Sequence, residues 1–171
     1  MNKYLFLDID GVLNGGNWIY SRDYLNTFSE NDFGVPIDNG YPENRFDPSK
    51  VSIVKRIVES TKCMIILSSD WRTYDFLDDP RSILIRYNSV KELLSSLGLN
   101  ISGYTPIGKS RGLEIKEYLD GLIYKDYVYC ILDDIDEFLP EQYDYLVKTK
   151  WSTGITEEDA IKVIKILNKN D

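Results

Sequence analysis

The sequence predicts an α/β protein with a central, mainly parallel sheet between two layers of helices, a three-layer Rossmann-like architecture. Three apolar runs, 4–7 together with Ile9, 63–67 and 127–132, lack a polar face, as strands buried inside a parallel sheet do. Segments with helical spacing of apolar residues separate these runs. Strands that alternate with helices, without an internal repeat, favour a layered α/β fold.

The first helix is predicted to begin at Asp47-Pro48, because Asp is a good N-cap and Pro suits the first helical turn. It runs to about residue 60, and the apolar strand 63–67 follows. The unit 4–67 is therefore a βαβ crossover, whose two strands should lie parallel and end at the same edge of the sheet.

Later segments continue the alternation. Gly98 and Gly121 are predicted to end two helices, and Thr156 to cap a third whose first turn is acidic. The region 73–87 is less regular, with a turn at 78–80 and a strand or helix at 83–85. The remaining expected elements are helices over 88–97, 110–121 and 156–169, and strands over 99–104 and 143–148.

Residues 15–47 interrupt this pattern. They are rich in Gly, Asn, Asp and Pro with interspersed aromatic residues, and a short helix is expected only over 22–28. So long a segment is either a functional lid or irregular packing over the core. We expect one domain over 1–171, with 15–47 as a small cap or lid insertion.

Composition narrows the function. The net charge of −8 argues against a broad nucleic-acid or membrane surface. The chain has no histidine, which excludes Ser-His-Asp and Cys-His catalysis and histidine-rich zinc sites. Cys63 and Cys130 lie in apolar runs, as buried reduced thiols do. No run is long enough to span a membrane and no signal-peptide pattern is present, so we expect a cytoplasmic protein.

Polar residues follow three of the predicted strands. Two basic residues lie at the start of the helix that precedes the third of these strands. The carboxyl ends of parallel strands meet at one edge, where open α/β sheets bind ligands. Each pair alone is equally explained as a turn or a helix cap, but their coincidence at one edge indicates a site. These residues are Asp8 and Asp10, Ser68 and Ser69, Lys109 and Arg111, and Asp133 and Asp134.

The chemistry that fits is phosphoryl transfer through an aspartate. Asp8 would attack phosphorus, and Asp10 would protonate the leaving oxygen and later activate water. Ser68 and either Arg111 or Lys109 would bind the phosphate oxygens. Carboxylates from two strands would hold one Mg²⁺, which prefers oxygen ligands.

These motifs resemble those of the haloacid dehalogenase-like (HAD) superfamily. LDIDGVLN is similar to its first motif, IILSS to the second, the basic residue of KSRGLEI to the third and ILDDIDE to the acidic fourth. The resemblance is closest to the HAD domain of Swiss Army Knife RNA-repair proteins, through DIDGVLN, SSDWR, RGLEIKEYL, ILDD and TGITEEDAIKVIKIL. It spans nearly the whole chain and is weakest over 15–47 and 73–105. It implies the HAD variant of the Rossmann-like fold.

The resemblance implies a role for each matching residue. Asp8 is the nucleophile and a metal ligand, and Asp10 is the acid/base with its backbone carbonyl on the metal. Ser68 matches the hydroxyl of the second motif, with Ser69 as the alternative. Arg111 is the first choice for the basic residue.

Lys109 is the second choice for that basic residue. Asp134 aligns with the metal-binding acid of the fourth motif, and Asp133 would orient a metal-bound water. Ser69, Arg72 and Gly11 are assigned to substrate binding.

Two features depart from the family pattern or restrict the substrate. Phe138 stands where the fourth motif has a further acid, so Asp136 or Glu137 would have to replace it. Residues 15–47 are short for a cap domain, which implies an open site. Aromatic residues near the motifs either stack on a base or pack the loop against the sheet: Trp18, Tyr20 and Trp71.

The sequence therefore predicts a Mg²⁺-dependent phosphatase that acts on a phosphomonoester through an aspartyl-phosphate. A nucleotide or small phosphoester suits the acidic net charge better than a nucleic-acid end, which stays an alternative. Two other functions stay open, a phosphomutase with the same paired aspartates and a non-catalytic binding or regulatory module. The oligomeric state is not determined.

Overall fold

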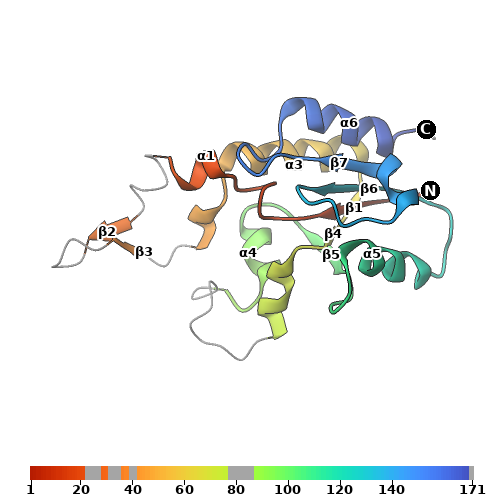
Figure 1. The fold of residues 1–171 in the computed structure, drawn as a ribbon, viewed down its shortest axis with the longest axis horizontal. Coiled ribbons are helices and arrows are strands. Elements are labelled where there is room, and N and C mark those ends of the chain that lie inside the picture. The colour runs from red at the N-terminus through yellow and green to blue at the C-terminus, as the bar shows by residue number, and fades with distance from the viewer. Residues whose placement is uncertain (22–27, 31–35, 39–41, 77–86, 170–171) are drawn as a thin grey trace.

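The computed structural model describes residues 1–21, 28–30, 36–38, 42–76 and 87–169. A parallel sheet lies at its centre, in the order β5-β4-β1-β6-β7 (Figure 1). The chain order reverses beside β1, and this is where open α/β sheets bind ligands. The predicted α/β class is confirmed. The strands are β1 (Asn2–Leu7), β4 (Met64–Leu67), β5 (Ile101–Tyr104), β6 (Tyr127–Asp133) and β7 (Leu146–Lys148).

Helices cover both faces of the sheet. In Figure 1, α3 (Pro48–Thr61) and α6 (Glu157–Leu167) lie together on one face, and α5 (Arg111–Asp120) lies on the other. Helix α4 (Val90–Ser96) packs beside β5. Successive side chains of β1 alternate between the two cores, because Leu5 and Leu7 join the core under α3 and α6 while Tyr4 and Phe6 join the core under α5.

Side-chain caps fix the helix starts where the sequence predicted them. The carboxylate of Asp47 accepts a hydrogen bond from the amide of Ser49 at 2.8 Å, ahead of the proline that opens α3. Thr156 and Asp159 form a reciprocal capping box at the start of α6. These starts orient α3 and α6 against the sheet.

One expectation about local structure changes. The expected strand over 143–148 is shorter, since β7 begins at Leu146 and the preceding residues form a 3-10 helix, η3 (Pro140–Tyr145). Pro140 opens this turn because its fixed φ suits a helical start. The ring of Tyr145 stacks on Tyr129 of β6, with centroids 4.5 Å apart. The pattern of apolar residues that suggested a strand here reflects packing against the sheet.

The described residues of the insertion 15–47 form four short elements. A two-stranded antiparallel hairpin, β2–β3, belongs to it and is separate from the central sheet (Figure 1). The helix expected over 22–28 falls mostly on residues outside the described part, and Phe28 belongs to β2. The features expected at 78–80 and 83–85 also lie outside it. The elements are α1 (Gly16–Ile19), β2 (Phe28–Glu30), β3 (Pro36–Asp38) and η1 (Pro42–Arg45).

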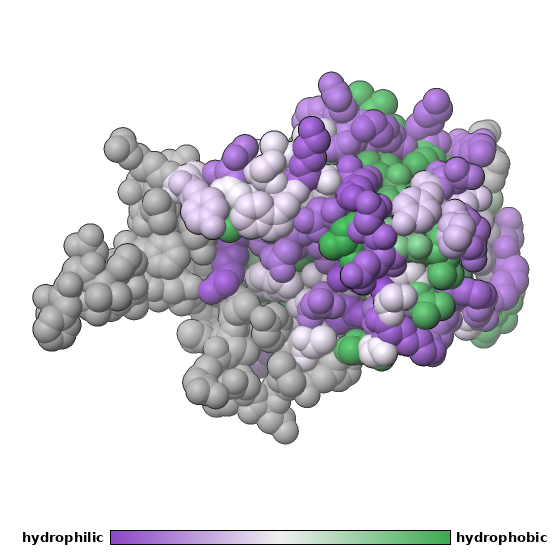
Figure 2. Space-filling model, viewed as in Figure 1, coloured by the Kyte–Doolittle hydropathy of each residue, from purple (hydrophilic) through white to green (hydrophobic). Residues whose placement is uncertain are grey.

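Within the described residues, no helix is long and apolar enough to cross a membrane. Figure 2 shows that hydrophilic side chains cover most of the described surface on one face, with small hydrophobic areas scattered among them. The site of interest lies where β1, β4 and β6 end.

Candidate active site

A row of polar residues lies just past the ends of three neighbouring strands, β1, β4 and β5. Each residue continues the backbone pairing of its strand by one further hydrogen bond, so their positions are fixed by the sheet. Two residues on from Phe6, Asp8 returns to the α5 face by the alternation of a strand. The bonds run from the amides of Asp8, Ser68 and Thr105 to the carbonyl oxygens of Leu132, Leu7 and Leu67, at 3.0, 3.0 and 3.1 Å.

Arg111 joins two of the predicted carboxylates. It is the first residue of α5, and its Nη1 donates hydrogen bonds to Asp8 Oδ1 at 2.9 Å and to Asp133 Oδ2 at 2.8 Å. Both carboxylates are buried. Burial by itself would lower the pKa of Arg111, but the charges of Asp133 and Asp8 outweigh it and the pKa is raised. The guanidinium therefore stays protonated between the two acids.

One guanidinium does not neutralise this site fully. Burial, and then the charge of Asp133, raise the pKa of Asp8 to about 7, although Arg111 acts in the opposite direction. Burial also raises the pKa of Asp133. Two buried carboxylates with raised pKa values indicate that the site favours further positive charge or protons.

A third carboxylate completes a set suited to a cation. One oxygen each of Asp8, Asp133 and Asp134 lies within 4.8 Å of the others. Gly11 makes room for Asp134, since its φ is +72° and a Cβ built on it would lie 2.3 Å from Asp134 Oδ2. Oxygen donors of this kind are the ligands that Mg²⁺ takes, so the residues present fit that ion.

Two hydroxyl groups near the carboxylates are buried without a hydrogen-bond partner among the described residues, Ser68 Oγ and Thr105 Oγ1. Unpaired buried hydroxyls are uncommon and costly, so each indicates a missing partner. The hydroxyl of Ser69 is already engaged, because it accepts a bond from the Trp71 amide at 3.4 Å and holds the pKa of Asp8 down. Of the two predicted serines, Ser68 is thus the one whose hydroxyl has capacity for a ligand oxygen.

The two basic candidates occupy different places. Arg111 contacts Asp8 and Asp133, whereas the ammonium of Lys109 pairs with Glu117 at 2.5 Å on the exposed side of α5. The structure therefore brings Arg111, and not Lys109, to the carboxylates.

Arg72 lies inside the protein, so the expected contact with substrate has to be corrected. Its side chain is 1% exposed. Its Nη1 donates to the backbone oxygens of Ser68 and Ser69 at 2.5 and 2.6 Å, and its Nη2 donates to Pro106 O at 3.0 Å and to the carboxylate of Glu114. Arg72 has almost no exposed surface to offer a substrate, and it holds the loop after β4 instead.

Glu114 is the partner that makes this burial of Arg72 possible. It lies one turn into α5, is buried, and also accepts hydrogen bonds from the amides of Gly108 and Lys109 at 3.0 and 3.2 Å. The Arg72–Glu114 ion pair therefore ties the loop after β4 to the start of α5. These two segments carry Ser68 and Arg111.

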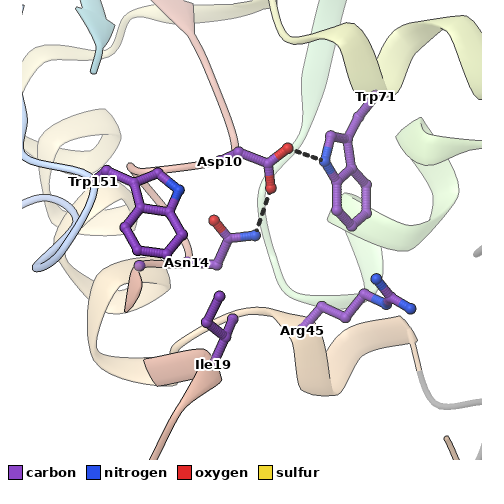
Figure 3. A pocket seen from close by; sticks show the side chains of 7 residues that line it. Asp10, Asn14, Ile19, Arg45, Trp71 and Trp151 are labelled. Carbon is purple, nitrogen blue, oxygen red and sulfur yellow. Dashed lines mark hydrogen bonds between the residues drawn. The ribbon is translucent and has the colours of Figure 1, made fainter. Parts of the chain in front are cut away.

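Asp10 faces a pocket beside the carboxylate set. Its Oδ2 accepts a hydrogen bond from Trp71 Nε1 and its Oδ1 from Asn14 Nδ2, both at 2.8 Å (Figure 3). These donors fix the orientation of the carboxylate. The pocket has a volume of about 350 Å³ and is lined by Asp10, Asn14, Gly15, Ile19, Arg45, Trp71 and Trp151.

Other candidates lie apart from the carboxylates. Asp136 pairs with Lys148 at 2.6 Å on the surface, and Phe138 is buried in the core under α5. Neither Asp136 nor Glu137 belongs to the described group of carboxylates that could hold a metal. Trp18 donates to the backbone oxygen of Asn44 at 3.1 Å, which packs it within the insertion.

Sequence reasoning missed residues that act through tertiary contacts. A weak signal existed for Glu114, three residues after Arg111 and on the same side of a helix, and for Asn14, in the loop that follows the paired aspartates. No local pattern singled out the others. The missed residues are Asn14, Arg45, Thr105, Glu114 and Trp151.

Comparison with known protein families gives a match over residues 4–160, to the family described as the HAD domain in Swiss Army Knife RNA repair proteins. No curated protein matches the chain in a sequence comparison. The match covers residues 4–7 of β1, the other four strands of the central sheet and every residue of the site described above. The chain therefore belongs to the family of HAD domains found in Swiss Army Knife RNA repair proteins.

Proposed function

We propose that this protein is a Mg²⁺-dependent phosphohydrolase that cleaves a phosphomonoester through an aspartyl-phosphate intermediate. The observation that carries the proposal is the bridge from Arg111 to Asp8 and Asp133 at 2.9 and 2.8 Å, beside the unpartnered hydroxyl of Ser68. Membership of a HAD family supports a hydrolase, and a phosphatase within that class.

The first step uses the carboxylate at the end of β1. An oxygen of Asp8 forms a bond to phosphorus while the bond from phosphorus to the leaving oxygen breaks. Arg111 holds Asp8 in place and offers its remaining donors to the phosphate oxygens, and Ser68 donates its hydroxyl to another. Satisfying that hydroxyl removes the unfavourable unpaired state that the free protein carries.

Asp10 carries the protons. It gives its proton to the leaving oxygen as the alcohol departs, and it takes a proton from the water that attacks phosphorus in the second step. The second attack breaks the bond between phosphorus and Asp8 and releases inorganic phosphate. Trp71 and Asn14 keep Asp10 turned toward the pocket throughout.

The carboxylates of Asp8 and Asp134 would hold Mg²⁺, with the backbone carbonyl of Asp10, and Asp133 would orient a water on it. When bound, the ion would offset the repulsion between a carboxylate and a phosphate dianion. In its absence Arg111 supplies part of this charge. The Gly11 backbone gives Asp134 the space to face Asp8.

The substrate we propose is a phosphorylated small molecule or nucleotide, and a nucleic-acid end is the wider alternative. The insertion 15–47 would act as a small cap over the site, within a single domain. Ser69 would assist by holding Asp8, and Gly11 by keeping the site open to substrate.

Phosphate release from phosphoesters, nucleotides and end-phosphorylated oligonucleotides, with and without Mg²⁺, tests the proposal. Asp8→Asn should abolish turnover without unfolding, because the amide cannot attack phosphorus. Asp136→Asn is the matched control, since Asp136 is a surface carboxylate paired with Lys148, and it should retain activity. Full activity in Asp8→Asn would refute the mechanism. Tight Mg²⁺ binding without turnover of any ester would instead favour a binding module.

A further inference from the structure

The pocket beside Asp10 has the form of a binding subsite. Two indole rings, those of Trp71 and Trp151, lie on opposite sides of Asp10 and Asn14, and Ile19 and Arg45 lie on the side away from Asp10 (Figure 3). Its volume of about 350 Å³ is enough for a small organic ligand. We propose, on the basis of the phosphohydrolase function above, that this pocket binds the leaving group and selects one with a flat aromatic ring.

The position of Asp10 makes this the leaving-group side. In the proposed reaction the leaving oxygen has to lie within hydrogen-bond distance of the Asp10 carboxylate. That carboxylate is held by Trp71 and Asn14 at 2.8 Å each and lines the pocket. Whatever the leaving oxygen carries must therefore enter the space between the two indoles.

Both indole rings are fixed before a ligand arrives. Trp151 is anchored by the Gly16 amide, which donates to its backbone oxygen at 2.9 Å, and its ring lies so close to Gly16 that a Cβ there would be 2.5 Å from Cζ3. Trp71 packs on Phe46 with centroids 5.3 Å apart. Trp71 is only 5% exposed, so Trp151 offers most of the ring surface, and a preset ring stacks on a flat ligand without an ordering cost.

The exposure of Trp151 is the second observation that indicates a ligand. Its side chain is 49% exposed, although it lies beside the site and against the backbone. A flat aromatic ring would cover this surface and gain stacking energy, whereas a puckered or chain-like group would leave gaps against the indole of Trp151.

Charge favours a small molecule over a long nucleic acid. The chain carries a net charge of −8, and among the described residues that line the pocket Arg45 is the one cation. Binding a polyanion takes several Lys or Arg contacts to phosphates. The inferred substrate class is therefore a monomeric phosphomonoester with an aromatic or heteroaromatic leaving group, of the size of a nucleoside.

A matched pair of esters tests the selection for flatness. Benzyl phosphate and cyclohexylmethyl phosphate both release a primary alcohol of similar size, and only the first carries a flat ring. We expect a KM for benzyl phosphate that is lower by about tenfold, the factor that one stacking contact supplies. Trp151→Leu should remove most of this ratio, and Trp151→Phe should keep most of it because a ring is retained.

Tyr124→Leu is the control, since Tyr124 is an exposed aromatic residue that precedes β6, at the opposite edge of the sheet. It should leave the ratio unchanged. Equal KM values for the two esters in the wild-type chain would overturn the inference while the phosphohydrolase function stands. A phosphorylated oligonucleotide cleaved with a higher kcat/KM than a nucleoside monophosphate would overturn the small-molecule class.

A binding measurement separates the two proposals if neither ester is hydrolysed. The phosphohydrolase function then fails, and binding of each ester in the pocket is measured by the quenching of tryptophan fluorescence. Quenching by benzyl phosphate that is stronger than quenching by cyclohexylmethyl phosphate, and that weakens in Trp151→Leu, supports the pocket. Equal quenching by both esters overturns it.

Discussion

Removing the carboxylate of Glu114 is expected to destabilise the protein strongly. Glu114→Leu leaves the guanidinium of Arg72, which is 1% exposed, without its countercharge in the interior. Breaking one side of a buried ion pair costs about 3–5 kcal/mol. A protein of this size loses roughly 2–4 °C in Tm per kcal/mol. The expected fall in Tm is therefore about 6–20 °C, a large part of a typical total stability.

A double variant tests the cause of this loss. Arg72→Met together with Glu114→Leu removes both charges, so the unpaired guanidinium no longer has to be buried. The double variant should unfold at a higher temperature than Glu114→Leu alone, because an apolar pair can replace a buried ion pair at little cost. Thermal or urea unfolding of the two singles and the double gives the coupling free energy.

The control lies on the same helix. Glu117 pairs with Lys109, and both side chains are about half exposed. Glu117→Leu should change stability by less than about 1 kcal/mol, since exposed pairs contribute little. If Glu114→Leu were as mild as Glu117→Leu, or if the double variant were the least stable of the set, the assigned role of the Arg72–Glu114 pair would be refuted.

Three further predictions concern the carboxylate site. Gly11→Ala should lower the free energy of unfolding by about 1–2 kcal/mol, since the φ of Gly11 is +72°. The added methyl group should also displace Asp134 and weaken Mg²⁺ binding. A calorimetric titration with Mg²⁺ that matches wild type would contradict this. Ser68→Ala should keep or slightly raise the Tm, because it removes an unpaired buried hydroxyl. The kcat/KM of this variant should fall by at least about tenfold. An unchanged kcat/KM would exclude Ser68 from phosphate binding. Because the pKa of Asp8 is raised from 3.8 to about 7, the stability that its neutral form contributes is fully present below about pH 4 and is lost as the pH rises to about 7 in metal-free protein. Mg²⁺ competes with that proton, so the rise in Tm on adding Mg²⁺ should be larger at pH 8 than at pH 6, and a rise independent of pH would argue against Asp8 as a ligand.

The architecture was predictable because its signals are local. Apolar runs without a polar face mark β1, β4 and β6 as interior strands, and the crossover rule then makes them parallel. Asp47 and Thr156 mark helix starts by side-chain capping, which depends only on neighbouring residues. The expected strand over 143–148 was partly wrong because stacking of Tyr145 on Tyr129, a contact between distant residues, places an aromatic side chain in a 3-10 turn.

The sequence by itself determined which residues meet at the carboxyl edge of the sheet, since parallel strands that end in Asp8, Ser68 and Asp133 must bring those ends together. Only the tertiary structure decided what each neighbouring side chain does there. Arg111 reaches the carboxylates while Arg72 is buried against Glu114. The physical reason is that a charged side chain takes its role from the partners available where it is buried, and those partners come from segments far apart in the chain.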